Sequence, residues 1–89
     1  MKKSNIHTSR FSTLKNSYQR LTYEEIKEGL NDLPEVLECK HMRVDNPKLT
    51  VEWHINIIDH CLSVKRMDLA RIHKSSLLNI YVLNKHYRK

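Results

Sequence analysis

The chain has 89 residues, of which 39% are hydrophobic and 29% are charged, and this composition is typical of one small globular domain. Only one glycine and two prolines are present, which argues against an all-β fold, because such folds need many tight turns with positive φ angles. The formal net charge of +6 favours an anionic partner, which can be nucleic acid, anionic lipid or an acidic protein.

The sequence predicts a cytoplasmic protein with reduced thiols. Its two cysteines, Cys39 and Cys61, are too few for a disulfide framework. Lysines rather than an apolar run follow Met1, so we expect no signal peptide. No stretch approaches the ~20 apolar residues of a membrane span, and we therefore expect no membrane partner.

Charge is distributed unevenly along the chain. Residues 1–20 hold five bases and no acid, residues 24–38 hold six acids against one base, and residues 65–89 hold seven bases against one acid. The few apolar residues of the first segment show no sustained period. We therefore predict a flexible basic tail at 1–20, which can add phosphate contacts, before a single small domain at 21–89.

The first predicted helix begins at a capping box. In Thr22-Tyr23-Glu24-Glu25, the Thr22 hydroxyl can accept from the backbone N–H of Glu25, whose side chain can reach back to the cap. The helix is expected over residues 23–33, with an apolar face formed by Ile26, Leu30 and Leu33. Pro34 disfavours helical geometry at the residue before it and marks the end.

The apolar residues of 35–48 follow neither the helical nor the strand period, so this segment is predicted to be irregular. It ends in a turn signal at Asp45-Asn46-Pro47-Lys48. Residues 49–62 have two interpretations. Alternation of apolar and polar residues from Leu49 predicts a strand that pairs with 36–44 in a hairpin. A helical stripe through Val51, Ile55, Ile58 and Leu62, with Thr50 as N-cap, predicts a helix. We favour the helix, because strict alternation fails at Ile58.

Residues 66–88 are predicted to be helical, with one shared apolar face. One long helix would place Ser76 within that face, so we expect a break near residues 73–76, with Ser75 or Ser76 capping a last helix. The predicted fold is thus a mainly α small domain, with helices at 23–33, 50–62, 66–73 and 76–88. The alternative is α+β: a helix, a β-hairpin across 36–58, and one or two C-terminal helices.

The run from Leu69 to Arg88 resembles the helix-turn-helix of insertion-sequence transposases and related regulators. It shows an Ala70-Arg71 start, a Ser76 cap, an apolar-Tyr pair and a Lys-His-Tyr-Arg end. The resemblance implies that the last helix enters the major groove of DNA. The sequence departs from the pattern at Leu78 and Val82, which stand where polar donors would face the bases.

A second resemblance lies earlier in the chain. Glu52-Trp53 followed eight residues later by Cys61-Leu62, downstream of Gly29-Leu30, is similar to the end of PerC and related small enterobacterial virulence regulators. Isoleucines replace the arginines that those proteins carry between the Trp and the Cys. Both resemblances imply a role in gene regulation.

Metal binding and catalysis are not predicted. Cys39, His41, His60 and Cys61 are potential ligands, but the chain lacks the spacing of a zinc knuckle, and adjacent residues diverge on a helix. Asp59-His60 and Cys61-His54 could be arranged into acid–base or nucleophile pairs, yet no catalytic motif is present. We expect no metal, no cofactor and no enzymatic activity.

The predicted function is that of a small DNA-binding transcriptional regulator of mobile-element or virulence origin. The residues expected to contact phosphate are the tail bases together with Arg71, Lys74, Lys85 and Arg88. Those expected to meet base edges are Ser76, Asn79 and Val82. The alternative is a protein-binding modulator that makes no contact with DNA. It would dock a ridge formed by Leu78 and Val82 onto a host or regulatory protein or onto a second copy in a homodimer.

Overall fold

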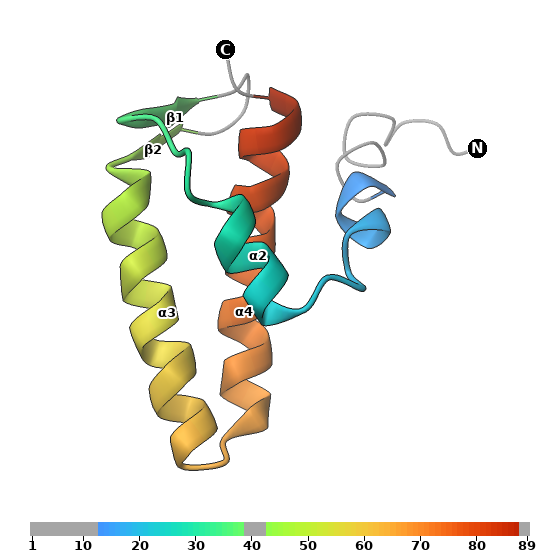
Figure 1. Ribbon diagram of the computed structural model, residues 1–89, viewed down its shortest axis with the longest axis vertical. Coiled ribbons are helices and arrows are strands. Elements are labelled where there is room, and N and C mark those ends of the chain that lie inside the picture. The colour runs from blue at the N-terminus through green and yellow to red at the C-terminus, as the bar shows by residue number, and fades with distance from the viewer. Residues whose placement is uncertain (1–12, 39–42, 88–89) are drawn as a thin grey trace, which may run out of the picture.

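An antiparallel pair of long helices, α3 (Pro47–Ser63) and α4 (Met67–Val82), forms one layer of the protein (Figure 1). The computed structural model describes residues 13–38 and 43–87. A short helix, α2 (Tyr23–Gly29), lies across this layer, and a two-stranded hairpin closes one end. Beyond α4 the chain continues as a π-helical turn, η2 (Leu83–Tyr87). The prediction of a mainly α small domain is confirmed.

Helix α2 begins as the capping box predicts. The Glu25 N–H donates to the Thr22 hydroxyl (3.1 Å), and the Thr22 N–H donates to the Glu25 carboxylate (2.8 Å). The helix ends at Gly29, four residues before the predicted end, and Leu30 has non-helical angles (φ −105°, ψ 19°). The residues that follow, among them Asn31 and Asp32, are poor helix formers. Leu33 is buried although it lies outside the helix.

The hairpin consists of β1 (Val36–Glu38) and β2 (Arg43–Asp45), paired antiparallel with Leu37 opposite Val44. Leu37 is buried, and Arg43 forms ion pairs with Glu38 (3.3 Å) and Asp45 (3.0 Å). The predicted irregular segment 35–48 therefore contains two short strands. The alternative fold is right about a hairpin and wrong about its extent, because the second strand ends at Asp45.

Helix α3 is confirmed in place of the alternative strand, and it starts three residues earlier than predicted. Asn46 adopts left-handed angles (φ 52°, ψ 56°), a conformation that Asn tolerates better than most residues. Pro47 can then occupy the first helical position, where a missing N–H costs nothing. Thr50 is therefore not the N-cap; its hydroxyl instead donates to the Asn46 carbonyl (3.4 Å).

Helix α4 is continuous, so the predicted break at 73–76 is wrong. The break was expected because Ser76 would put a hydroxyl on an apolar face. In the structure this hydroxyl donates to the Ile72 carbonyl one turn back (3.5 Å), and the helix itself thus satisfies the polar group. Ser75, the other predicted cap, accepts a hydrogen bond from the Lys15 ammonium (2.8 Å).

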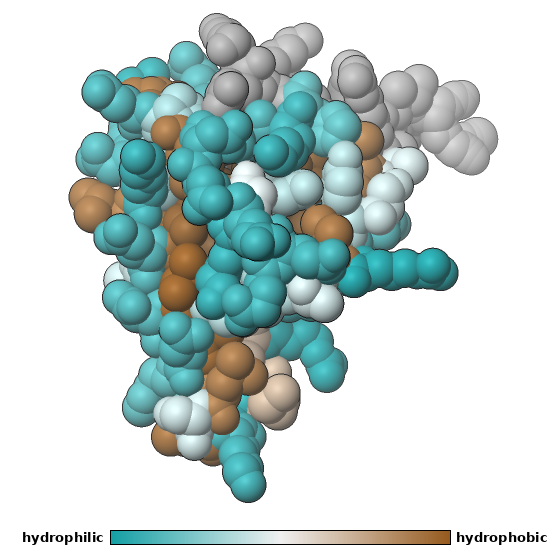
Figure 2. All heavy atoms as spheres, viewed as in Figure 1, coloured by the Kyte–Doolittle hydropathy of each residue, from teal (hydrophilic) through white to brown (hydrophobic). Residues whose placement is uncertain are grey.

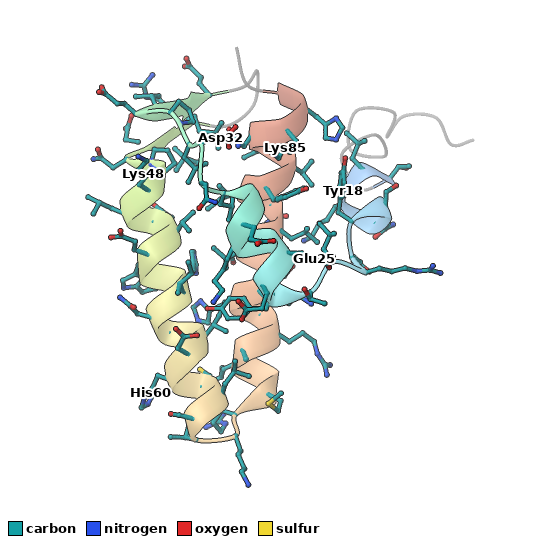
Figure 3. All side chains as sticks on the ribbon, viewed as in Figure 1. Tyr18, Glu25, Asp32, Lys48, His60 and Lys85 are labelled. Carbon is teal, nitrogen blue, oxygen red and sulfur yellow. The ribbon has the colours of Figure 1, made fainter. Side chains whose placement is uncertain are left out.

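Residues 13–20, the last part of the predicted tail, pack along α4. The Tyr18 ring lies edge-on to Tyr81 (centroids 5.2 Å apart), and its hydroxyl is 2.8 Å from Nε2 of His86. Figure 3 shows Tyr18 on the segment beside α4. These residues belong to the folded domain, and residues 1–12 lie outside the described residues.

The core lies between α2 and the α3–α4 layer, and Leu37 adds to it from the hairpin. Its most buried side chains are Ile26, Leu37, Ile58, Leu77 and Val82. The buried Asn84 amide donates to Asp32 (3.1 Å) and ties η2 to the loop after α2. The Cα atoms span 44 × 32 × 17 Å, and the shortest dimension is the one along which α2 is stacked on the α3–α4 layer (Figure 1). In the described part of the chain, no helix is long and apolar enough to cross a membrane.

We expect Gly29→Ala to destabilise the fold. An added Cβ would overlap Cε2 of Tyr81 and lie 3.0 Å from Cδ2, on a ring that Tyr18 holds in place. Overpacking of this kind costs about 1–3 kcal/mol, which exceeds the helix-propensity gain of about 1 kcal/mol. The measurement is the free energy of unfolding in urea, followed by circular dichroism.

A double-mutant cycle provides the control. Tyr81→Leu removes the ring atoms that the new Cβ would meet, so adding Gly29→Ala to that variant should cost much less than in the native background. A Gly29→Ala protein as stable as the native one would show that Tyr81 moves aside freely.

Candidate functional site

Leu78 and Val82 do not form an exposed ridge. Their side chains are 4% and 0% exposed, so both belong to the core. Contacts of Gly29 and Tyr18 with Tyr81 show that α2 and residues 13–20 pack over this side of α4. The predictions that Val82 meets DNA bases and that Leu78 and Val82 dock a partner are therefore wrong.

The other two predicted base-reading residues, Ser76 and Asn79, are partly buried. The helix that carries them is not a separate recognition helix, because α4 runs unbroken from Met67. It lies antiparallel to α3 after a tight turn in which Lys65 has a positive φ of 62°. The described residues thus form a helical hairpin of α3 and α4, and the predicted turn before a separate recognition helix at 76–88 is absent.

The predicted phosphate-binding side chains are placed more favourably. Arg71 and Lys85 are exposed and Lys74 is partly exposed, whereas Arg88 lies outside the described residues. Arg71 and Lys74 meet at a shallow apolar groove of about 210 Å³, which is also lined by Tyr23, Ile58, Leu62, Met67 and Ala70. Lys85 lies beyond α4 in η2, with its ammonium 5.6 Å from the centre of the Tyr81 ring.

Tyr23 closes one side of this groove and fastens α2 to α3. Its hydroxyl donates to Asp59 (2.9 Å), and it lies 3.4 Å from the Ile55 carbonyl. Burial and the neighbouring Asp59 raise the pKa of Tyr23 well above its usual value, so the hydroxyl stays protonated. Asp59 is thus hydrogen-bonded to Tyr23, on the side of α3 that α2 covers.

The opposite face of the α3–α4 layer, which we call the open face, carries a different set of side chains. Successive helix residues turn by about 100°, which places eight at least partly exposed positions on the side away from α2, beside the buried Cys61 and Ile80. They are Thr50, Trp53, His54 and Ile57 of α3, and Leu69, Ile72, His73 and Ser76 of α4. None of them is Lys, Arg, Asp or Glu, in a chain of which 29% is charged.

The open face exposes large apolar groups. Trp53 is 58% exposed, Ile72 59% and Leu69 36%, and Leu49, one turn before Trp53, is 63% exposed. The indole of Trp53 reaches across to His73 of α4 (centroids 5.7 Å apart), so the two helices form one continuous surface. The face that α2 covers is dominated by hydrophilic side chains, with apolar residues visible mainly in the seams between helices (Figure 2).

A pair of histidines occupies the centre of the open face. Nδ1 of His54 lies 2.9 Å from Nδ1 of His73, and the Trp53 ring packs on both imidazoles, with its centroid 5.0 Å from that of His54. A hydrogen bond at this distance needs one Nδ1–H donor and one unprotonated Nδ1 acceptor, so at most one of the two rings is protonated. Burial, and secondarily the charge of His73, lowers the pKa of His54.

The sequence does not predict this pair, because 19 residues separate its members and no motif links them. The signal that could have found it is the hairpin itself: residues equally far from the turn face each other across two antiparallel helices. The predicted break at 73–76 places His73 at the end of a helix, so the sequence does not indicate that this residue lies within a long helix beside α3.

The predicted potential metal ligands do not converge. Cys39 and His41 lie outside the described residues. His60 is exposed on the outer side of α3 (Figure 3), whereas Cys61 is buried with a free thiol. Within residues 13–38 and 43–87, no group of three or more His, Cys, Asp or Glu side chains could hold a metal ion.

No protein-family model matches the chain, and comparison with curated proteins and with solved structures finds no match. The resemblances to transposase-type regulators and to PerC-like regulators therefore stay predictions.

We expect the free energy of unfolding to fall as the pH drops below the usual imidazole pKa of about 6.5. The pKa of His54 is lower in the folded protein than in the unfolded chain. Above about 6.5 neither state protonates His54, whereas below it the unfolded state takes up the proton first and is stabilised relative to the native state. Urea midpoints measured across this range test the expectation.

The matched comparison is between His54→Gln and His60→Gln. Both remove one imidazole from α3, but only the first removes the partly buried ring. His54→Gln should flatten the pH dependence, and His60→Gln should leave it close to that of the native protein. Equal slopes in the two variants would contradict the assignment to His54.

Proposed function

We propose that the chain is a small non-catalytic docking module that binds helical protein surfaces through its open face, and that its first partner is a second copy of itself. The observation that supports this proposal is that Trp53, Leu69 and Ile72 are exposed on a face of eight positions, none of which is Lys, Arg, Asp or Glu. Interface cores are depleted in charged residues and enriched in aromatic ones.

Charge explains why two copies can meet on this face. Each chain carries a net charge of +6, so most pairs of surfaces would repel each other. A two-fold symmetric contact places each face against its own copy, and like charges on it would oppose one another. The open face lowers this cost because its polar groups are hydroxyls and one hydrogen-bonded imidazole pair, in which at least one ring is neutral.

Shape and size support the same partner. The open face is a layer of two antiparallel helices, and a second such layer would complete a four-helix arrangement. Helix α3 has 17 residues. Its length of about 25 Å, with a paired width of about 20 Å, gives a footprint of roughly 500 Å² before surface relief is counted. Specific interfaces bury about 600–1,000 Å² per partner, so we expect a concentration-dependent dimer.

Ile72→Glu should abolish self-association, because each copy would bury an unpaired carboxylate in the contact. Met67→Glu is the matched control: Met67 lies on the same helix with nearly the same exposure (56% against 59%), but it lines the groove on the α2 side. Sedimentation velocity over a range of protein concentrations measures the association.

Trp53 provides a second readout, since it is the only tryptophan in the chain. Its emission should shift to shorter wavelength as the concentration of the native protein rises, and should stay fixed in Ile72→Glu. A native protein that remains monomeric with unchanged emission at all concentrations would refute self-docking.

A second candidate function is binding to nucleic-acid phosphate, as expected of a cytoplasmic regulator. It is favoured by Arg71 and Lys74, which share the α2 side of α4 by helical spacing, and by the exposed Lys85 beyond them in η2. A dimer built on the open face would leave these bases exposed on its outer surfaces. Because Val82 is buried, the proposed contacts are to the sugar–phosphate backbone of the nucleic acid and give no sequence specificity.

Lys74→Glu combined with Lys85→Glu should weaken binding to a labelled random duplex and reduce the slope of log K against log [salt] by about two, since about one counterion is released per phosphate contact. Fluorescence anisotropy at several salt concentrations measures this slope. The control is Lys48→Glu, an exposed base near the start of α3 (Figure 3). Identical slopes for the double variant and the control would contradict a phosphate site on α4.

A further inference from the structure

We propose that His54 and His73 form a binding site for a divalent transition metal, with copper(II) as the ion that fits best. Their two Nδ1 atoms converge from neighbouring helices to 2.9 Å, on a surface that solvent reaches. The site goes beyond the docking function, because both ligands belong to one chain and need no second copy.

The separation of the two nitrogens sets the coordination geometry. Imidazole nitrogens bind such ions at about 2.0–2.1 Å, and two donors 2.9 Å apart would then subtend roughly 90° at the metal. A right angle is the cis arrangement of a square-planar or tetragonal site, which copper(II) and nickel(II) prefer. A tetrahedral zinc site would need the two nitrogens to move apart.

The number of ligands also favours copper. Structural zinc sites are closed by four protein side chains, whereas the described part of this chain brings only two imidazoles together here. Copper(II) has the highest affinity of the divalent first-row ions for a given set of nitrogen ligands. Water would occupy the remaining positions on the open face.

The two ligands are held in place before any metal arrives. His54 lies between the buried residues Val51 and Ile58 of α3, and His73 lies between Ala70 and Leu77 of α4. Ligands on rigid helices lose little conformational freedom on binding. When both rings are neutral, the ring that donates in the hydrogen bond needs only to transfer its proton from Nδ1 to Nε2, and both lone pairs then face the ion without net proton release.

Trp53 makes the site measurable. Its ring centroid lies 5.0 Å from His54 and 5.7 Å from His73, and copper(II) quenches the fluorescence of an indole at such distances. Titration of the full chain with copper(II) chloride should quench the emission with a 1:1 endpoint. His54→Gln and His73→Gln should each weaken binding about a hundredfold, because one imidazole lacks the effective concentration of two linked ligands.

His60→Gln is the control, since it removes an exposed imidazole of α3 that lies outside the pair. It should leave the copper affinity unchanged. If either pair variant binds copper as tightly as the native protein, or if His60→Gln weakens binding equally, the site is not at His54 and His73.

Electron paramagnetic resonance of the native protein tests the proposal without any variant, in case His54→Gln or His73→Gln fails to fold. At one equivalent of copper(II), the spectrum should be tetragonal with hyperfine splitting from two imidazole nitrogens. A spectrum of hydrated copper, or one with a single nitrogen, would overturn the proposal. Zinc chloride, titrated in competition, should displace the copper only at a large excess.

Discussion

The antiparallel packing of α3 against α4 is the constraint on which the rest of the structure depends. It fixes the register of the two longest helices from the tight turn at Lys65, whose positive φ reverses the chain. Ile58 and Ala70 then meet at the groove, and His54 meets His73 farther from the turn. Helix α2 covers one side of the pair, and this leaves the other side open.

Local signals in the sequence predicted the elements whose stability is local. The capping box at Thr22 determined the start of α2, and the apolar stripe from Val51 to Leu62 correctly favoured a helix over a strand. The wrong prediction of a break in α4 has a local cause as well. An apolar face need not exclude a serine, because the helix offers the Ser76 hydroxyl a carbonyl one turn back.

The candidate site could not be predicted in the same way, because it depends on contacts between distant segments. The period of α4 showed that Leu78 and Val82 lie on one side, but not that α2 and residues 13–20 would bury that side. Ile72 is exposed because the same packing covers only the opposite side of α4. The His54–His73 pair likewise follows from the register of the hairpin and from no local motif.

The net charge of the open face depends on the protonation of one hydrogen-bonded pair, His54 and His73. Its eight positions are uncharged only while His54 and His73 are both neutral, and burial favours the neutral form of His54 by lowering its pKa. Protonation of the pair, or a copper(II) ion between the two nitrogens, would place positive charge at the centre of an apolar surface. In a two-fold contact that charge would face its own copy, so self-docking and cation binding at this pair oppose each other.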